Sequence, residues 1–318
     1  MSAAFRSSDA RAHPRRVDLA ALPARDRAVL RLLYRMEAAT ARQLTNLAYR
    51  RARKAQYRLQ QLWLLRLTER TAVATDHAGA PPYAYRLTYH VRQRLGYRTD
   101  RPQLSSRLRH LLDSHDVVCA LAQPTADAPE GPMQAWLTAP MAGRILGSAV
   151  EPDGVVILQL QARSAVVCIE LDEGTEHHPV IIDKLERYVA QLRDRNGWHL
   201  LFVVPGRDRL VRVRRLARRP GLAKRGHAWV ALLADVRRRG LNADAYPAWS
   251  VDEPVALADL IDDPRDRRSD APVASGAWLR MLATGGVEDF DRSLAGSVPQ
   301  SIPPLERSSG TAILVTPK

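Results

Sequence analysis

Two carboxylates stand at the ends of neighbouring apolar segments in the middle of the chain. Asp153, inside a Pro-Asp-Gly turn, precedes the apolar run 155–161, and Glu170 lies near the end of the next run, 165–171. Such a turn is common and indicates little alone. Adjacent strands would bring the two carboxylates together, and carboxylate oxygens are ligands that Mg²⁺ prefers and Mn²⁺ also accepts. We therefore expect Asp153 and Glu170 to be the metal ligands of a phosphodiesterase-type site, where the cation polarises phosphate and activates water.

A lysine follows this pair at short range. The 48 cationic residues include only four lysines, Lys54, Lys184, Lys224 and Lys318. Lys184 would stabilise an attacking hydroxide or the charge that builds on phosphate; the alternative is a surface pair with Asp183 or Glu186. Asp172 is the fourth candidate catalytic residue, either as a second metal ligand or as the group that orients Lys184.

Regular elements must position these side chains. The pattern predicts a helix over 103–121, strands over 133–138, 155–161 and 165–171, a helix over 179–195 and a strand over 198–204. Pro179 suits a first helical turn, and Asn196-Gly197 ends the helix. The fold class is therefore α/β in this half of the chain.

This helix–three strands–helix–strand order resembles the αβββαβ core of the PD-(D/E)xK, restriction-endonuclease-like, superfamily. Pro152-Asp153 is similar to the PD element, and Glu170-Leu171-Asp172 stands where the (D/E)xK element would be. Asp172 replaces the expected lysine. Some members of the superfamily carry the lysine on the following helix, where Lys184 lies. The resemblance implies either an active Mg²⁺ site or an inactive nuclease fold.

Positive charge is concentrated in the first third of the sequence. Residues 1–100 contain 20 Lys and Arg against 7 Asp and Glu, a surplus of 13, and the remaining residues add 1 to reach the total of +14. A surface that binds a polyanion is therefore expected mainly in the N-terminal part.

The N-terminal part shows three short helical patterns followed by two strands. The helices are expected over 26–34, over a second segment capped by Thr40, and over 51–64, with strands at 67–73 and 83–87 around a turn at 76–82. This order resembles a winged helix-turn-helix domain whose third helix enters the major groove. The candidate DNA contacts are Arg42, Arg51, Arg53, Lys54 and Arg58. The alternative is a basic but merely solvated helix.

A second basic segment, 207–225, carries nine cations over an apolar stripe. Arg212 and Arg215 are candidate contacts to the DNA backbone in the nuclease interpretation, and a solvated arginine-rich helix is the alternative. Residues 228–236 are expected as a last strand or a buried helix, and 246–251 would cover the sheet edge.

The expected organisation is a flexible basic arm over 1–22, the winged helix over 23–100, the nuclease-like domain over 103–255 and a disordered tail over 256–318. The polar, basic N-terminus does not resemble a secretory signal, and no apolar run is long enough for a membrane span. Cys119 and Cys168 lie in apolar runs and are expected as buried hydrophobic residues. A cytoplasmic protein with no membrane partner is therefore expected.

Several stretches, in their order, resemble the replication-relaxation family of bacterial, mostly plasmid-associated, proteins. They are Thr40-Ala41-Arg42-Gln43-Leu44, 83–88, His110-Leu111-Leu112, the acidic block 170–176, Lys184-Leu185-Glu186-Arg187-Tyr188 and Leu201-Phe202-Val203. One departure is that the third helix runs into Trp63-Leu64-Leu65-Arg66 without a glycine before the strand 67–73, which begins the wing. The resemblance implies a role in plasmid replication and DNA relaxation.

Two hypotheses remain open from the sequence. The first is a Mg²⁺- or Mn²⁺-dependent DNA endonuclease or nickase that the winged helix delivers to double-stranded, plasmid DNA. The second is a catalytically inactive nuclease fold that serves a DNA-binding replication or transfer factor, or a transcription regulator. Other replication or transfer proteins and a second copy of the chain are the further expected partners.

Overall fold

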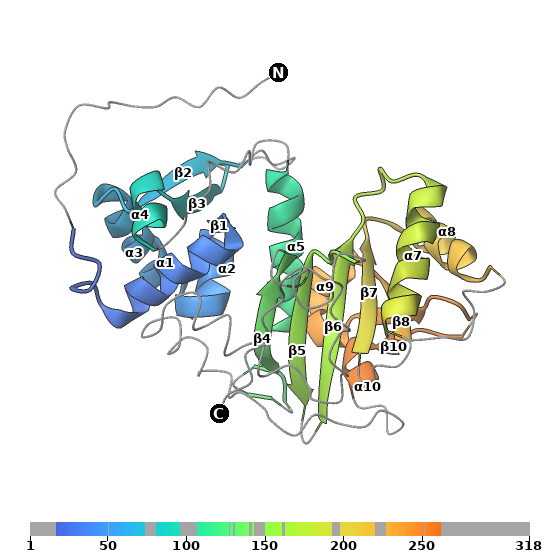
Figure 1. The fold of residues 1–318 in the computed structure, drawn as a ribbon. Helices are drawn as coiled ribbons and strands as arrows, with labels where there is room; N and C mark the ends of the chain where they lie inside the picture. Colours follow the sequence, from blue (N-terminus) through green and yellow to red (C-terminus); the bar gives the residue numbers. More distant parts are fainter. Residues whose placement is uncertain are drawn as a thin grey trace, which may run out of the picture. The chain divides into compact units, whose positions relative to one another are not determined.

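The computed structural model describes residues 17–49, 51–73, 81–95, 107–126, 128–129, 131–139, 142, 150–160, 163–192, 198–219, 227–250 and 252–261. These residues form two compact units, one ending at Leu112 and the other starting at Asp113 (Figure 1). Expectations that fall on the arm before residue 17, on most of the tail and on the segment 74–80 lie outside the described residues.

The first unit combines short helices with a small antiparallel sheet. Its helices are α1 (Ala24–Met36), α2 (Ala41–Leu44), the π-helical turn η1 (Thr45–Tyr49), α3 (Ala52–Leu64) and α4 (Tyr89–Arg94). Its strands are β1 (Ala39–Thr40), β2 (Thr68–Ala72) and β3 (Tyr83–Leu87), in the order β1-β3-β2. The three helices and two later strands follow the predicted order, and β1 is an addition that the sequence pattern did not indicate.

Local signals explain where these helices begin. The hydroxyl of Thr40 accepts a hydrogen bond from the main-chain amide of Gln43 at 3.2 Å. In return, the side-chain oxygen of Gln43 accepts one from the main-chain amide of Thr40 at 2.9 Å. This reciprocal capping box satisfies two amides that the helix leaves unpaired, so Thr40 is the predicted N-cap. Helix α3 begins at Ala52, which is exposed, whereas Ala55, three residues later, is buried.

The exit from α3 uses a left-handed residue although the sequence has no glycine there. Arg66 has a φ of 56°, its amide donates to the Trp63 carbonyl at 2.8 Å, and the Leu67 amide donates to the Leu62 carbonyl at 2.9 Å. These two bonds form a Schellman-type helix end, with Arg66 in the position that glycine usually occupies. The chain therefore turns from α3 into β2 as a glycine-containing sequence would.

The second unit is built on one mixed sheet. Its helices are α5 (Leu108–Leu121, which belongs to the second unit from Asp113 onward), α7 (His178–Leu192), α8 (Arg207–Ala217), α9 (Leu233–Arg239), the 3₁₀ turn η2 (Gly240–Asn242) and α10 (Leu257–Ile261). The strands are β4 (Met133–Thr138), β5 (Gly154–Leu160), β6 (Arg163–Leu171), β7 (Trp198–Val204), β8 (His227–Leu232), β9 (Asp244–Pro247) and β10 (Val255–Ala256). Their order is β10-β9-β8-β7-β6-β5-β4, and β6, β7 and β8 run parallel while the other neighbours are antiparallel.

The mixed helix and sheet content confirms the α/β class. Strands β4 and β7 have the predicted bounds, and β5, β6 and α7 shift by a few residues. Residues 228–236 are not a single element, because β8 ends at Leu232 and α9 begins at once. Residues 246–247 belong to β9, which pairs with β8 as part of the sheet and does not merely cover its edge.

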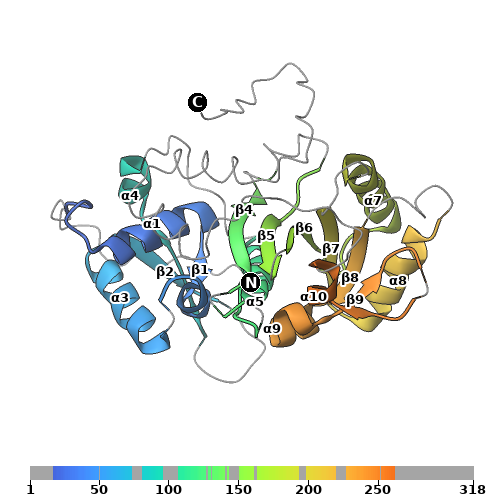
Figure 2. The same ribbon diagram turned by 90° about the horizontal axis from the view of Figure 1, so that it is seen from below.

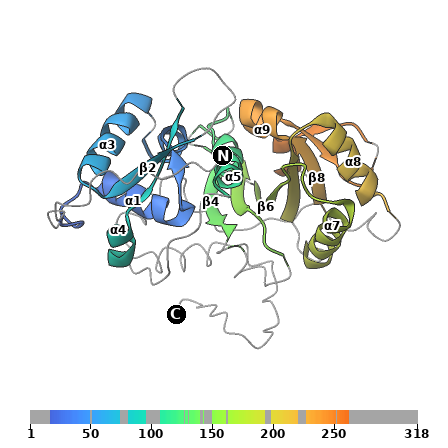
Figure 3. The same cartoon turned by 90° about the horizontal axis from the view of Figure 1, so that it is seen from above.

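Helices cover both faces of this sheet (Figures 2 and 3). One face carries α7 and α8, which pack against each other and against β7. On the other face, Leu121 of α5, Leu241 of η2 and Leu257 of α10 share an apolar cluster with side chains from β5 to β8. Because alternate strand residues point to opposite faces, Cys168 and Glu170 share one face of β6 while Val167 belongs to the other.

The two cysteines and the helix lengths agree with the composition. Cys119 and Cys168 are both buried and form no disulfide, as expected for small core residues. Among the described residues, no helix combines the length and the apolar character needed to cross a membrane.

Candidate metal centre and nucleic-acid interface

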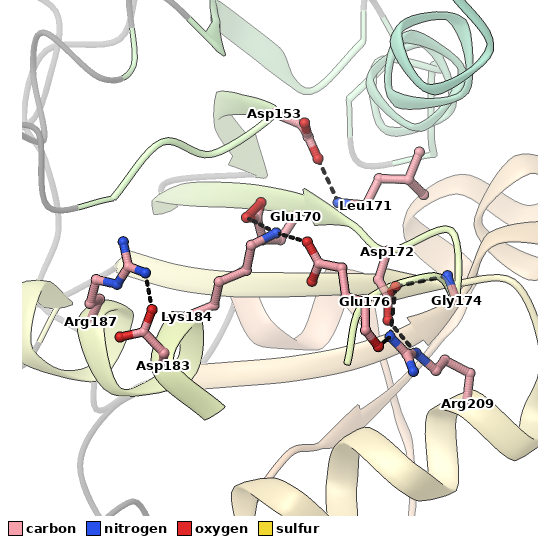
Figure 4. Close-up of polar contacts among 10 residues, drawn as sticks. All are labelled: Asp153, Glu170, Leu171, Asp172, Gly174, Glu176, Asp183, Lys184, Arg187 and Arg209. Atoms are coloured by element: carbon pink, nitrogen blue, oxygen red, sulfur yellow. Dashed lines mark hydrogen bonds and ion pairs between the residues drawn. The ribbon is translucent and has the colours of Figure 1, made fainter. Parts of the chain in front are cut away.

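The two predicted metal ligands meet across the β5–β6 pair. Gly154 pairs with Ile169, so continuing the antiparallel register by one residue places Asp153 opposite Glu170. The Leu171 amide donates a 2.8 Å hydrogen bond to Oδ2 of Asp153, which fixes the carboxylate at the strand end (Figure 4). Glu170 is buried, with 4% of its surface exposed. The sheet register thus brings together the two side chains that lie 17 residues apart in the sequence.

Lys184 of α7 joins this pair. Its Nζ lies 3.2 Å from Oε1 of Glu170 and 2.5 Å from Oε1 of Glu176, so one ammonium group bridges two carboxylates (Figure 4). Asp183, which the sequence offered as an alternative partner of Lys184, instead pairs with Arg187 on the surface of α7. The helix that follows β6 therefore turns Lys184 toward the strand-end carboxylates.

The electrostatics of the centre depend on its burial. Desolvation, with a further contribution from the Asp153 charge, raises the pKa of Glu170 to about 8, although the Lys184 ammonium acts in the opposite direction. For Lys184, burial alone lowers the pKa, but Glu170 and Glu176 outweigh it and the pKa is raised. A second cation beside Asp153 and Glu170 would favour the ionised form of both carboxylates.

Asp172 has a different partner from either one expected from the sequence. Its carboxylate accepts from Nε of Arg209 at 2.5 Å and from Nη2 at 3.0 Å, and it also accepts from the Gly174 amide at 2.7 Å. Asp172 and Arg209 are both buried, at 2% and 8% exposure. Asp172 is therefore half of a buried, bidentate ion pair and is turned toward Arg209, whereas Lys184 binds Glu170 and Glu176.

Two residues at this centre were absent from the sequence-based candidates. Glu176 holds Lys184, and Arg209 holds Asp172 and also donates to the Glu176 carbonyl at 2.8 Å. Helical spacing could have indicated that Arg209 is buried, because it lies on the same face of α8 as the buried Val213 and Leu216. The acidic block 170–176 already contained Glu176, but nothing in it distinguished that carboxylate from Glu173.

Two buried polar atoms beside the carboxylates make no hydrogen bond to any described residue. They are the hydroxyl of Tyr188 and Oε2 of Glu176. Burial and the nearby Glu170 raise the pKa of Tyr188, so the phenol is neutral and can donate a proton in a hydrogen bond. The described residues contain no group of three or more side chains arranged to hold a metal ion. The oxygen pair and these polar atoms fit a hydrated Mg²⁺, which commonly takes one or two carboxylates and keeps several waters.

The predicted DNA contacts of the first unit separate into two groups. Arg42 on α2 and Arg51, Arg53 and Lys54 at the start of α3 are all exposed. Arg58 is different: its guanidinium pairs through two nitrogens with Asp26 of α1, which is only 1% exposed. Arg58 therefore ties α3 to α1, and four of the five predicted cations remain on the outer surface.

Helix α8 presents the second predicted group. Arg212 and Arg215 are exposed on its outer face, beside Val211 at 63% exposure. Arg214 turns the other way, where its guanidinium donates to the carbonyls of Pro247 at 3.0 Å and Ser250 at 2.9 Å. Only part of the basic segment is thus available to a polyanion.

Comparison with known proteins identifies the family. The family model described as replication-relaxation matches residues 30–199, which is more than half of the 318 residues. The chain belongs to the replication-relaxation family. No curated protein and no solved structure gives a significant match.

The matched region of this replication-relaxation protein runs from α1 to the start of β7. It therefore contains Asp153, Glu170, Glu176 and Lys184, whereas Arg209 lies beyond it. Membership points to a role in plasmid replication or relaxation. The family region thus includes Asp153, Glu170 and the residues that contact Glu170, whereas Arg209 of α8, which binds Asp172, lies outside it.

Proposed function

We propose that this replication-relaxation protein binds double-stranded plasmid DNA and that its second unit is a Mg²⁺-dependent endonuclease or nickase. The observation that carries the proposal is the cross-strand pair of Asp153 and Glu170 with the Lys184 ammonium 3.2 Å from Glu170. Paired carboxylates beside a lysine are suited to phosphodiester hydrolysis, because the reaction needs a cation site and a group that stabilises negative charge.

Asp153 and Glu170 would hold the cation, and Mn²⁺ would be accepted at the same oxygens. When bound, the cation supplies polarisation of the scissile phosphate and a lowered pKa of water. Because burial raises the pKa of Glu170 to about 8, the cation would displace the proton of this acid and would then compensate the charge of the ionised carboxylate.

The protein groups around the cation site have separate tasks. Lys184 donates to the phosphate or to an attacking hydroxide, and its partial exposure of 28% leaves one side open to a ligand. The neutral hydroxyl of Tyr188 and Oε2 of Glu176 orient water in the buried part of the site. Asp172 keeps the loop after β6 in place through Arg209 and does not contact the substrate.

DNA would be held by the first unit, which we interpret as a winged helix-turn-helix domain. Its α3 exposes Arg51, Arg53 and Lys54 at the N-terminal end, and α2 adds Arg42. Cations on adjoining helix ends are suited to the phosphates that border a major groove. Arg212 and Arg215 of α8 extend the phosphate contacts in the second unit.

The test is incubation of the full chain with supercoiled plasmid in Mg²⁺ or Mn²⁺, beside the variants Asp153→Ala and Glu170→Ala. Asp183→Ala is the matched control, because it removes an exposed carboxylate of α7 that pairs only with Arg187 among the described residues. Nicked or linear product from the parent and from the control, and none from the other two, supports the proposal. Equal product from all four proteins would exclude this site as the source of cleavage.

A second candidate function has its own observation. The carboxylate in the usual lysine position, Asp172, is neutralised by Arg209, and no third metal-ligating side chain joins Asp153 and Glu170 among the described residues. An inactive nuclease fold that serves a DNA-binding replication factor or a transcription regulator fits these facts. A gel shift that persists in Asp153→Ala, without cleavage by the parent protein, would favour this second function.

A further inference from the structure

We infer that Arg209 is a positioning residue that holds Lys184 at Glu170 by fixing the loop that carries Glu176. The inference rests on the proposed function, because it concerns the arrangement of the same site. Arg209 itself touches neither Glu170 nor Lys184 in any described contact; its effect would pass through the loop between β6 and α7.

Arg209 grips the loop at both ends. At the first end, its guanidinium binds Asp172, and Asp172 in turn accepts from the Gly174 amide, where the chain takes a φ of 84°. At the second end, Nη2 of Arg209 donates to the Glu176 carbonyl at 2.8 Å. One buried side chain thereby sets both ends of a five-residue turn.

The loop then sets Lys184. Oε1 of Glu176 lies 2.5 Å from Nζ of Lys184, which is the shorter of the two carboxylate contacts of that ammonium (Figure 4). Glu176 is the group that keeps a long, partly exposed side chain at Glu170, since an unrestrained lysine gains rotamer entropy by moving into water. Displacement of the Glu176 backbone would therefore release Lys184.

Stability alone is a poor explanation for this arrangement. A buried ion pair contributes little net stability, because desolvation of both charges offsets their attraction. The fork of Arg209 divides its donors between a side chain and a main-chain carbonyl, and this division fixes geometry in a way that a single lysine contact would not. The positions of the donors thus favour a role in orientation.

The test uses a single and a double variant. Arg209→Met leaves Asp172 buried without its partner and is expected to destabilise the second unit, so Arg209→Met combined with Asp172→Leu removes both charges and keeps the fold. Arg214→Met is the matched control, because Arg214 also lies on α8 and also clamps main-chain carbonyls, but those of Pro247 and Ser250.

The readout is the rate at which acetic anhydride modifies Lys184 in the full chain, measured by mass spectrometry. The exposed Lys54 of α3 serves as the internal reference, and the chain has only four lysines to resolve. In the double variant we expect the rate at Lys184, relative to Lys54, to rise about tenfold, as the loss of a charge-assisted hydrogen bond to the ammonium implies. Arg214→Met should leave the ratio unchanged.

The outcome separates this inference from the proposed function. An unchanged ratio in the folded double variant, or an equal rise in Arg214→Met, would overturn the role of Arg209 whether or not the protein cleaves DNA. A rise confined to the Arg209 variants supports the role even if the parent protein fails to nick plasmid. If the parent protein does nick plasmid, the double variant should have a lower kcat, while the KM for DNA stays the same.

Discussion

Raising the pH should destabilise the metal-free protein through Glu170. Burial, together with the charge of Asp153, raises the pKa of Glu170 from 4.5 to about 8. The folded chain therefore favours the protonated acid, and this contribution is complete below pH 4.5 and lost as the pH rises to about 8. At about 1.4 kcal/mol for each pH unit between those values, the free energy of unfolding falls by about 5 kcal/mol.

The variant Glu170→Gln isolates this effect, because the amide resembles the protonated acid in shape and does not titrate. Urea unfolding of both proteins, with a chelator present, would be followed by tryptophan fluorescence, to which Trp198, buried in β7, contributes. The unfolding free energy of the parent minus that of Glu170→Gln should fall by about 5 kcal/mol across the window, since the titrating groups that do not interact with Glu170 cancel. A difference that stays constant from pH 4.5 to about 8 would refute the desolvation argument.

Divalent cations should reverse the trend. Binding of Mg²⁺ or Mn²⁺ requires the ionised carboxylate, so the parent protein should gain stability above pH 8, by about 3 kcal/mol at a cation concentration 100 times Kd. Glu170→Gln should gain much less. A thermal shift with and without the cation measures this, and absence of a shift in the parent would reject metal binding while leaving the pKa argument intact.

Three further predictions concern the first unit. Arg66→Gly should stabilise it by up to about 1 kcal/mol in urea unfolding, because glycine adopts the φ of 56° without strain; a net loss would show that side-chain contacts of Arg66 outweigh the strain. Arg58→Ala should lower the free energy of unfolding by about 3 kcal/mol, because it leaves Asp26 buried and unpaired. Lys54→Ala should change it by less than about 0.5 kcal/mol, and equal values for the two variants would contradict the role assigned to Arg58. Arg51→Ala combined with Lys54→Ala should weaken DNA binding and lower the salt slope by up to about 2, and unchanged binding would remove α3 from the interface.

The strands that carry the metal pair were predictable because their signals are local. The Pro-Asp-Gly turn and the two apolar runs set the ends of β5 and β6 to within two residues of their observed bounds. The register was not contained in those run ends: Leu160 pairs with Arg163, and this pairing places Asp153 opposite Glu170. The site pair thus follows from the two segments together with a register that only the structure gives.

Elements fixed by distant partners were harder to predict. The two-residue strands β1 and β10 exist because they pair with β3 and β9, and such short segments carry no periodicity of their own. The division of residues 228–236 into β8 and α9 has the same origin: the part that lies beside β7 is extended, and the chain becomes helical where that pairing ends.

Buried ionic partners illustrate the same limit at the level of side chains. Asp26 falls on the apolar face of α1, at a spacing of three, four and seven residues from Val29, Leu30 and Leu33, so its burial was predictable from helical phase. Its partner was not, because α3 offers several cations and only the packing of α3 on α1 selects Arg58.

The strand position that should carry the lysine shows how the site combines local and distant information. Residues 170 and 172 point to the same face of the sheet, so a lysine at 172 would lie beside Glu170. Here that position is directed at Arg209 on α8, and the ammonium reaches Glu170 from Lys184 on α7. The two helices that cover this face therefore supply both cations: α7 provides the ammonium group beside Glu170, and α8 provides the guanidinium that neutralises Asp172. Asp172→Lys alone would place two ammonium groups near Glu170 and leave Arg209 buried without its carboxylate, so urea unfolding should show a lower free energy of unfolding than in the parent protein.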